Sequence, residues 1–336
     1  MKKNLLLLGM AFYFMNVAYA QQSSTTILKK GCAVKEICKV QWDTPQGLRY
    51  KKVAGTNLGV TSFEVMDKNH IAFLSDASNE IIIAEKLSGK ALSRYTVANA
   101  PRDFVYDKGN FYVLFENSVI VYDEKGTILK TIPYPNSLVG VERIARYNNS
   151  TYLLLPSGNS VQIESASGAS VNEVYKGWIT SSGMFVYGKL SGANSYMVQV
   201  SGADGKSYEK VFTTALKTAG VYVVGSTQNR VVLDIQTYIS ESPIQVERHL
   251  VTIELSSTGL GDIISDSKVP DCYYVLSNKD FVLEDNGTVL NMVTAPQGVL
   301  LFSLTEVERQ KAQNYPASLL AIKYHFNDHL LQVNEK

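Results

Sequence analysis

The sequence has 336 residues, of which 45% are hydrophobic, and its 32 basic and 31 acidic side chains give a formal net charge of +1. Because the two signs are interspersed, no basic stripe is present to neutralise phosphates, which argues against nucleic-acid binding. A chain of this length could form two domains, but an array of repeated small units can reach this size as one body.

Residues 1–20 have the pattern of a bacterial secretory signal peptide, in which a basic start, an apolar run and a small-residue cleavage site follow one another. These features are Lys2 and Lys3, then the run from Leu5 to Val17, then Ala18-Tyr19-Ala20. A membrane anchor is the alternative, but the run is shorter than the span of about 20 residues that a bilayer needs. We expect cleavage before Gln21 and a periplasmic or secreted protein without a transmembrane segment in the mature chain.

Residues 21–45 are predicted to form an irregular N-terminal arm that contains Cys32 and Cys38. In an oxidising compartment, two cysteines this close most simply form a local disulfide. Cys272 then remains unpaired, or it pairs with one of the two instead. No histidine lies near the arm, so a metal site is disfavoured there, and the spacing is wider than that of a C-x-x-C redox pair.

The stretch of residues 62–97 predicts four short strands, because apolar runs alternate with clusters of Asn, Asp, Ser and Gly. The first strand of this unit recurs at a spacing of about 40 residues, with one longer interval before the last copy. The copies begin at Ser62-Phe63-Glu64-Val65, Asp103-Phe104-Val105-Tyr106, Arg143-Ile144-Ala145-Arg146, Met184-Phe185-Val186-Tyr187, Val221-Tyr222-Val223-Val224 and Asp280-Phe281-Val282-Leu283. Four strands per repeat with this period predict an all-β, six-bladed β-propeller.

The pattern resembles the six-bladed propellers of the NHL type, in which a hydrophobic–x–hydrophobic strand and a D-x-x-G turn recur in each blade. The turn is represented here by Asp123-Glu124-Lys125-Gly126. The resemblance covers about residues 46–306 and implies a fold rather than an activity.

We expect the chain ends to close the ring, because an open ring would leave an unpaired strand edge at each end. Residues 48–53 look like the fourth strand of the first repeat, residues 92–97, while the last repeat lacks a fourth strand. Residues 48–53 are therefore predicted to complete that blade beside Val299–Ser303. The C-terminal residues 307–336 are expected to form an appendage, since they offer little strand character for a seventh blade.

The fifth repeat, residues 220–277, is longer than the others. We place its extra length in two loops, around Tyr238–Glu247 and around Gly259–Asp271. Loops extended on one blade are candidates for a contact surface, although neutral sequence drift in a solvent-exposed loop is the simpler alternative.

Catalytic motifs are not apparent: there is no G-x-S-x-G elbow, and His325 and His329 lack the intervening Glu of an H-E-x-x-H zinc site. If a small ligand binds, we expect it at the mouth of the central tunnel, where the starts of the inner strands converge. The side chains to test are Asp103, Arg143 and Asp280. Two acids and one arginine are few ligands for a calcium ion, which takes six to eight oxygens.

These features favour a non-catalytic binding or scaffold propeller of the bacterial envelope that contacts a protein partner and needs no cofactor. Such modules occur in outer-membrane, pilus and secretion assemblies, which is an argument by analogy. The alternatives are a calcium-dependent propeller hydrolase or lactonase and a lectin-like module that binds glycans.

Overall fold

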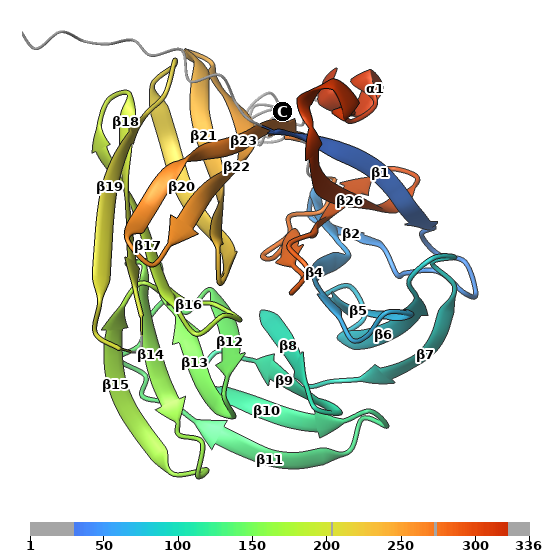
Figure 1. Ribbon diagram of the computed structural model, residues 1–336. Helices are drawn as coiled ribbons and strands as arrows, with labels where there is room; N and C mark the ends of the chain where they lie inside the picture. Colours follow the sequence, from blue (N-terminus) through green and yellow to red (C-terminus); the bar gives the residue numbers. More distant parts are fainter. Residues whose placement is uncertain (1–29, 203, 272–273, 322–336) are drawn as a thin grey trace, which may run out of the picture.

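The computed structural model describes residues 30–202, 204–271 and 274–321, and these form a closed ring of six antiparallel four-stranded sheets (Figure 1). A separate two-stranded hairpin lies in the chain between the first strand and the first complete blade. The six-bladed propeller predicted from the repeat is confirmed. Residues 1–20, Cys272, His325 and His329 lie outside the described residues.

The first three blades follow the predicted repeat, each with its first strand on the channel side and its fourth strand outermost. Blade one comprises β4 (Val60–Val65), β5 (His70–Ser75), β6 (Glu80–Glu85) and β7 (Ala91–Thr96). Blade two comprises β8 (Asp103–Asp107), β9 (Asn110–Leu114), β10 (Ser118–Asp123) and β11 (Ile128–Pro133). Blade three comprises β12 (Arg143–Tyr147), β13 (Ser150–Leu154), β14 (Asn159–Glu164) and β15 (Ser170–Lys176).

Blade four differs from its prediction at the inner strand. The inner strand is the two-residue β16 (Trp178–Ile179). Most of Met184–Tyr187, the predicted inner strand, instead forms the beginning of the second strand, β17 (Phe185–Gly192). The N–H of Gly183 bonds the carbonyl of Thr180, so a tight turn connects the two strands. The outer strands are β18 (Ser195–Ser201) and β19 (Ser207–Thr213).

Blade five is built from longer strands than the other blades. They are β20 (Thr218–Thr227), β21 (Arg230–Glu241), β22 (Ile244–Ser256) and β23 (Gly259–Val269). The prediction of two long loops in this blade is therefore wrong. The first of these segments is the far end of the β21–β22 hairpin, and the second is mostly the outermost strand.

Blade six is completed by the N-terminus, as predicted, but by a different segment. Its own strands are β24 (Phe281–Leu283), β25 (Val289–Ala295) and β26 (Gly298–Glu308), and β1 (Lys30–Val40) pairs antiparallel with β26. The register runs from Val40 opposite Val299 to Lys30 opposite Glu308. The predicted irregular arm thus contains a strand, and residues 48–53 do not close the ring. Lys51–Val53, strand β2, pairs instead with β3 (Thr56–Leu58) in the small hairpin, and all three of its residues are exposed.

Strand β1 fits this place because its side chains alternate between the core and solvent. Cys32 and Val34 are buried on one side of a bulge at residues 36–38, and Cys38 and Val40 are buried on the other. Both cysteines are free thiols, so the predicted local disulfide is wrong. An extended strand rises about 3.3 Å per residue, which separates the two by roughly 20 Å, whereas a disulfide needs Cα atoms within about 7 Å.

Hydrophobic clusters fill the spaces between neighbouring blades. The cluster that closes the ring joins Phe63 and Phe73 of blade one to Leu290 and Leu301 of blade six. Beyond β26, the chain passes a 3-10 turn at Arg309–Lys311 and ends its described part in helix α1 (Ala317–Ala321). Among the described residues, no helix is long and apolar enough to cross a membrane.

The C-terminal segment covers the outer edge of β1. The N–H of Val34 bonds the carbonyl of Gln313 at 3.1 Å, and the N–H of Gln313 bonds the carbonyl of Cys32 at 2.9 Å. Tyr315 is buried against Phe302, with ring centroids 4.9 Å apart. The appendage expected after residue 306 is therefore packed on blade six where it is described, and it protects an edge that would otherwise be open.

Candidate functional site

The candidate site is the central channel, which holds two adjoining cavities of about 530 and 560 Å3. The first includes Arg102 and Glu142, which precede the inner strands of blades two and three, and the second includes Asp107 and Arg146 near the ends of those strands. The cavities share five lining residues, which are Arg143, Trp178, Val223, Val224 and Phe281. The two cavities therefore meet at Arg143 and these neighbours.

Lys279 is a buried cation that ties three blades together. It lies just before β24 in blade six, and its side chain is 2% exposed. Its Nζ donates to Glu64 Oε1 of blade one at 2.6 Å and to the carbonyl of Phe104 in blade two at 2.5 Å. It also lies 3.3 Å from Asp103 Oδ1. Burial raises the pKa of Glu64, while Lys279 acts in the opposite direction.

Arg248 has the corresponding position between blades five and six. Its Nη2 donates to Asp234 Oδ2 at 2.7 Å, and its Nη1 donates to Asp280 Oδ2 at 2.8 Å. The guanidinium also lies over the ring of Phe281, 5.2 Å from its centroid. Burial raises the pKa of Asp234, which Arg248 counteracts. The charge pair is almost wholly desolvated, so removing either partner would leave a costly buried charge.

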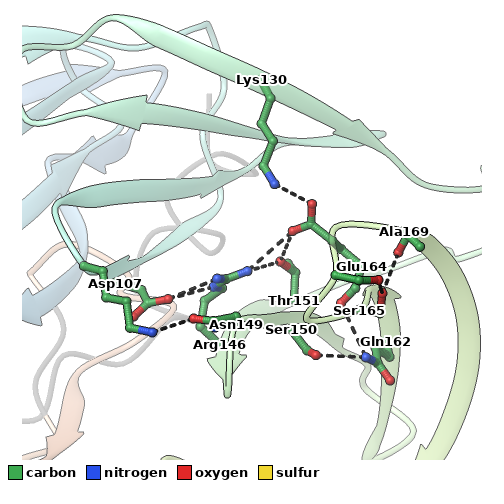
Figure 2. A network of polar contacts seen from close by, with 12 residues as sticks. Asp107, Lys130, Arg146, Asn149, Ser150, Thr151, Gln162, Glu164, Ser165 and Ala169 are labelled. Atoms are coloured by element: carbon green, nitrogen blue, oxygen red, sulfur yellow. Dashed lines mark hydrogen bonds and ion pairs between the residues drawn. The ribbon is translucent and has the colours of Figure 1, made fainter.

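A third network joins blades two and three, and its Asp107 and Arg146 also line the second cavity (Figure 2). Arg146 donates to Asp107 Oδ2 from Nε and Nη2, both at 3.1 Å, and to Thr151 Oγ1 at 2.7 Å. Glu164 accepts from Thr151 and also pairs with Lys130 of β11. The guanidinium lies 4.0 Å from the ring centroid of Tyr112. These charges neutralise one another and position the two blades.

The three side chains predicted for the tunnel mouth divide into two groups. Asp103 is fully buried, and its Oδ2 accepts from the N–H of Ile144 at 3.1 Å. Asp280 accepts from Arg248, so both acids are held within the protein. Arg143 faces the two cavities, and its Nε is buried without a hydrogen-bond partner among the described residues. Its guanidinium lies 5.4 Å from the ring centroid of Trp178.

The sequence reading missed Lys279, Arg248 and Trp178. Lys279 directly precedes Asp280, which was predicted to lie at the tunnel mouth. A lysine next to an acid at the start of an inner strand could have indicated a buried ion pair. Arg248 lies on the third strand of its blade and reaches the channel past β21, which no local pattern reveals. Trp178 was hidden because its strand has only two residues.

A cation site of the calcium type finds no support in this geometry. In the described part of the chain, no group of three or more His, Cys, Asp or Glu side chains could hold a metal ion. Glu64 faces Lys279, and Asp234 and Asp280 face Arg248, so these three carboxylates already accept from cations of the protein.

No protein-family model matches this chain, and no curated protein matches it either. Several solved structures are similar in architecture. Hydrazine synthase of Kuenenia stuttgartiensis matches with 14% identity and a TM-score of 0.45 over 69% of this chain and 75% of that chain. BamB of Moraxella catarrhalis matches with 11% identity and a TM-score of 0.37 over 81% and 97%, respectively. Hsv2 of Kluyveromyces lactis matches with 8% identity and a TM-score of 0.41 over 82% and 99%. At these levels the similarity carries no functional argument.

Proposed function

We propose that this chain is a non-catalytic binding propeller of the bacterial envelope, which contacts a protein partner through the far end of blade five. We place it in the periplasm or outside the cell, because residues 1–20 have the pattern of a cleaved signal peptide. In this proposal the chain is an NHL-like propeller and a component of an outer-membrane, pilus or secretion assembly.

The observation that carries the proposal is the projecting end of the β21–β22 hairpin. The two strands have 12 and 13 residues, against 6 residues in each of β5 and β6. The buried core of blade five ends near Thr237 and Arg248, and the hairpin continues beyond both. This end is visible as the upper tip of blade five in Figure 1.

Apolar side chains are exposed on this projection and beside it. Ile244 is 58% exposed, Ile239 is 44% exposed, and Leu216 on the adjoining connection is 45% exposed. The projection is an ordered hairpin, because β21 and β22 stay paired as far as Glu241 opposite Ile244. Lys217 Nζ also lies 3.0 Å from Glu241, and Lys268 pairs with Glu247. An ordered hairpin with apolar tips loses little conformational entropy on binding, which suits a protein interface.

A photo-crosslinking amino acid at position 244 tests the proposal in cells that produce the full chain. We expect it to capture one stoichiometric envelope protein, and we expect Ile239→Asp combined with Ile244→Asp to weaken that complex at least about tenfold. An exposed charge should not change the melting temperature, since surface substitutions usually alter stability by less than about 0.5 kcal/mol.

Leu87 provides the matched control, because it is 74% exposed on blade one, away from the projection. The same crosslinker at position 87, and the Leu87→Asp variant, should leave the complex unaffected. Equal capture from positions 87 and 244, or no capture from either, would contradict the proposed interface.

A further inference from the structure

Arg143 lines both cavities, and its Nε is buried without a hydrogen-bond partner among the described residues. It lies at the start of β12, and its guanidinium lies over the ring of Trp178, which also lines both cavities. A guanidinium carries five N–H donors, and a buried donor without an acceptor is unfavourable. The face of Trp178 offers attraction but no oxygen acceptor.

Four carboxylates near the channel bond other cations, while Glu142 lines the first cavity beside Arg143 and is exposed. Glu64 and Asp103 bond Lys279, while Asp234 and Asp280 bond Arg248. Each of these groups holds two carboxylates against one cation. An anion on Arg143 would also lie in the cavity that Glu142, Asp234 and Asp280 line, which disfavours a second negative charge on that anion.

One part of the wall of the first cavity is apolar or aromatic. It comprises Val141, Val223, Val224, Phe281 and Trp178, while Arg102 and Glu142 add charged groups and Ser277, Asn278, Gln236 and Tyr222 add polar groups. A cavity of about 530 Å3 lies within the usual range of roughly 300–1,000 Å3 for small-molecule sites. Arginine is also the side chain best shaped to bind a carboxylate through two parallel hydrogen bonds.

We propose that the central channel binds a small monocarboxylate with an apolar body, with its carboxylate on Arg143 and its body against Trp178 and Phe281. The carboxylate belongs either to a free organic acid or to the chain end of a peptide. This site is separate from the blade-five projection, and its occupancy does not depend on the proposed protein partner.

Calorimetric titration of the full protein with benzoate, hexanoate and inorganic phosphate tests the proposal. We expect benzoate and hexanoate to bind in a 1:1 ratio and to change the fluorescence of Trp178, whereas phosphate should bind at least about tenfold more weakly. N-acetyl-Ala-Phe with a free carboxyl end, compared with its amide, separates the two sources. Binding of the free-ended peptide alone would assign the carboxylate to a chain end.

The variant Arg143→Met keeps an unbranched side chain that reaches as far as the position of Nε, and it removes the donors. We expect it to weaken binding of the acids about 10- to 100-fold, as the loss of a charged hydrogen-bonding group does. It should leave the melting temperature of the ligand-free protein unchanged or higher, because the buried Nε donor without an acceptor is removed. Arg49→Gln, at an exposed arginine of the β1–β2 connection, should bind like the parent.

The absence of carboxylate binding up to millimolar concentration would overturn the proposal. So would equal binding by Arg143→Met, or phosphate binding as tight as benzoate binding. A large loss of stability in ligand-free Arg143→Met would assign the side chain to the ring's own structure instead.

Discussion

At the scale of single residues, Lys279 shows how buried charges hold the blades in place. Lys279→Met would leave Glu64 and Asp103 buried without their cation, which should lower the free energy of unfolding by about 3–5 kcal/mol at neutral pH. The loss should shrink in acid, because burial already raises the pKa of Glu64 and protonation removes its charge. Urea unfolding at several pH values measures both effects.

Lys311→Met is the matched control for this substitution. Lys311 pairs with Glu308 at 3.0 Å, but both side chains are about 70% exposed. An exposed pair contributes little, so this variant should stay within about 1 kcal/mol of the parent. Equal stability losses in the two variants would contradict the role assigned to Lys279.

His249 makes the stability of blade five depend on pH. Burial alone would lower the pKa of His249, but hydrogen bonds and charges from Asp266 and Glu247, each 2.7 Å away, outweigh it and raise the pKa. Burial alone would raise the pKa of Glu247, but hydrogen bonds and charges from Lys268 and His249 outweigh it and lower the pKa. The stabilisation from His249 is full below the unfolded pKa of about 6.5 and is lost as the pH rises through the folded pKa.

The same linkage sets the acid limit. The contribution of Glu247 is present above its unfolded pKa of about 4.3 and is lost as the pH falls through its lowered folded pKa. We therefore expect His249→Gln to remove a contribution of roughly 0.5–1 kcal/mol near pH 5.5 and little of it at pH 9. Thermal unfolding at both pH values is the measurement, and an identical loss at the two would refute the assignment.

At the scale of elements, glycines in the tight turns set the spacing between blades. The N–H of Gly126 bonds the carbonyl of Asp123 at 3.0 Å, and φ of Gly126 is +82°, which confirms the D-x-x-G turn. A Cβ at this position would lie 2.8 Å from Tyr95 of blade one. The turn therefore serves both the hairpin of blade two and its contact with the neighbouring blade.

Gly126→Ala compared with Gly109→Ala separates these two roles. Gly109 has the same φ of +82°, but nothing lies within 4 Å of its Cβ position. Backbone strain alone should cost Gly109→Ala about 1 kcal/mol, while the clash with Tyr95 should cost Gly126→Ala a further 1–3 kcal/mol or so. If chemical denaturation gave the two variants equal losses in the free energy of unfolding, the contact between the blades would not contribute to stability.

The elements also show how far sequence reasoning reaches. The period of about 40 residues predicted six sheets, because each blade repeats the same alternation of strands and turns. The closing strand was misplaced because the bulge at residues 36–38 interrupts the alternation of β1 and its cysteines suggested a disulfide. Ala54 and Gly55, both with positive φ, make a two-residue turn that folds residues 51–58 onto themselves. Within the channel, Arg143 was identifiable from its place at an inner-strand start, whereas Arg248 depended on contacts between blades.

At the scale of the whole molecule, the channel and the projecting hairpin both depend on a ring that the N-terminal strand completes. Hydrogen exchange of the full protein, resolved by peptide, tests this closure directly. We predict that the amides of Lys30–Val40 are protected as strongly as those of Val289–Ala295, while those of residues 51–58 exchange fast. Rapid exchange over Lys30–Val40, together with protection of residues 48–53, would contradict the closure on which the account rests.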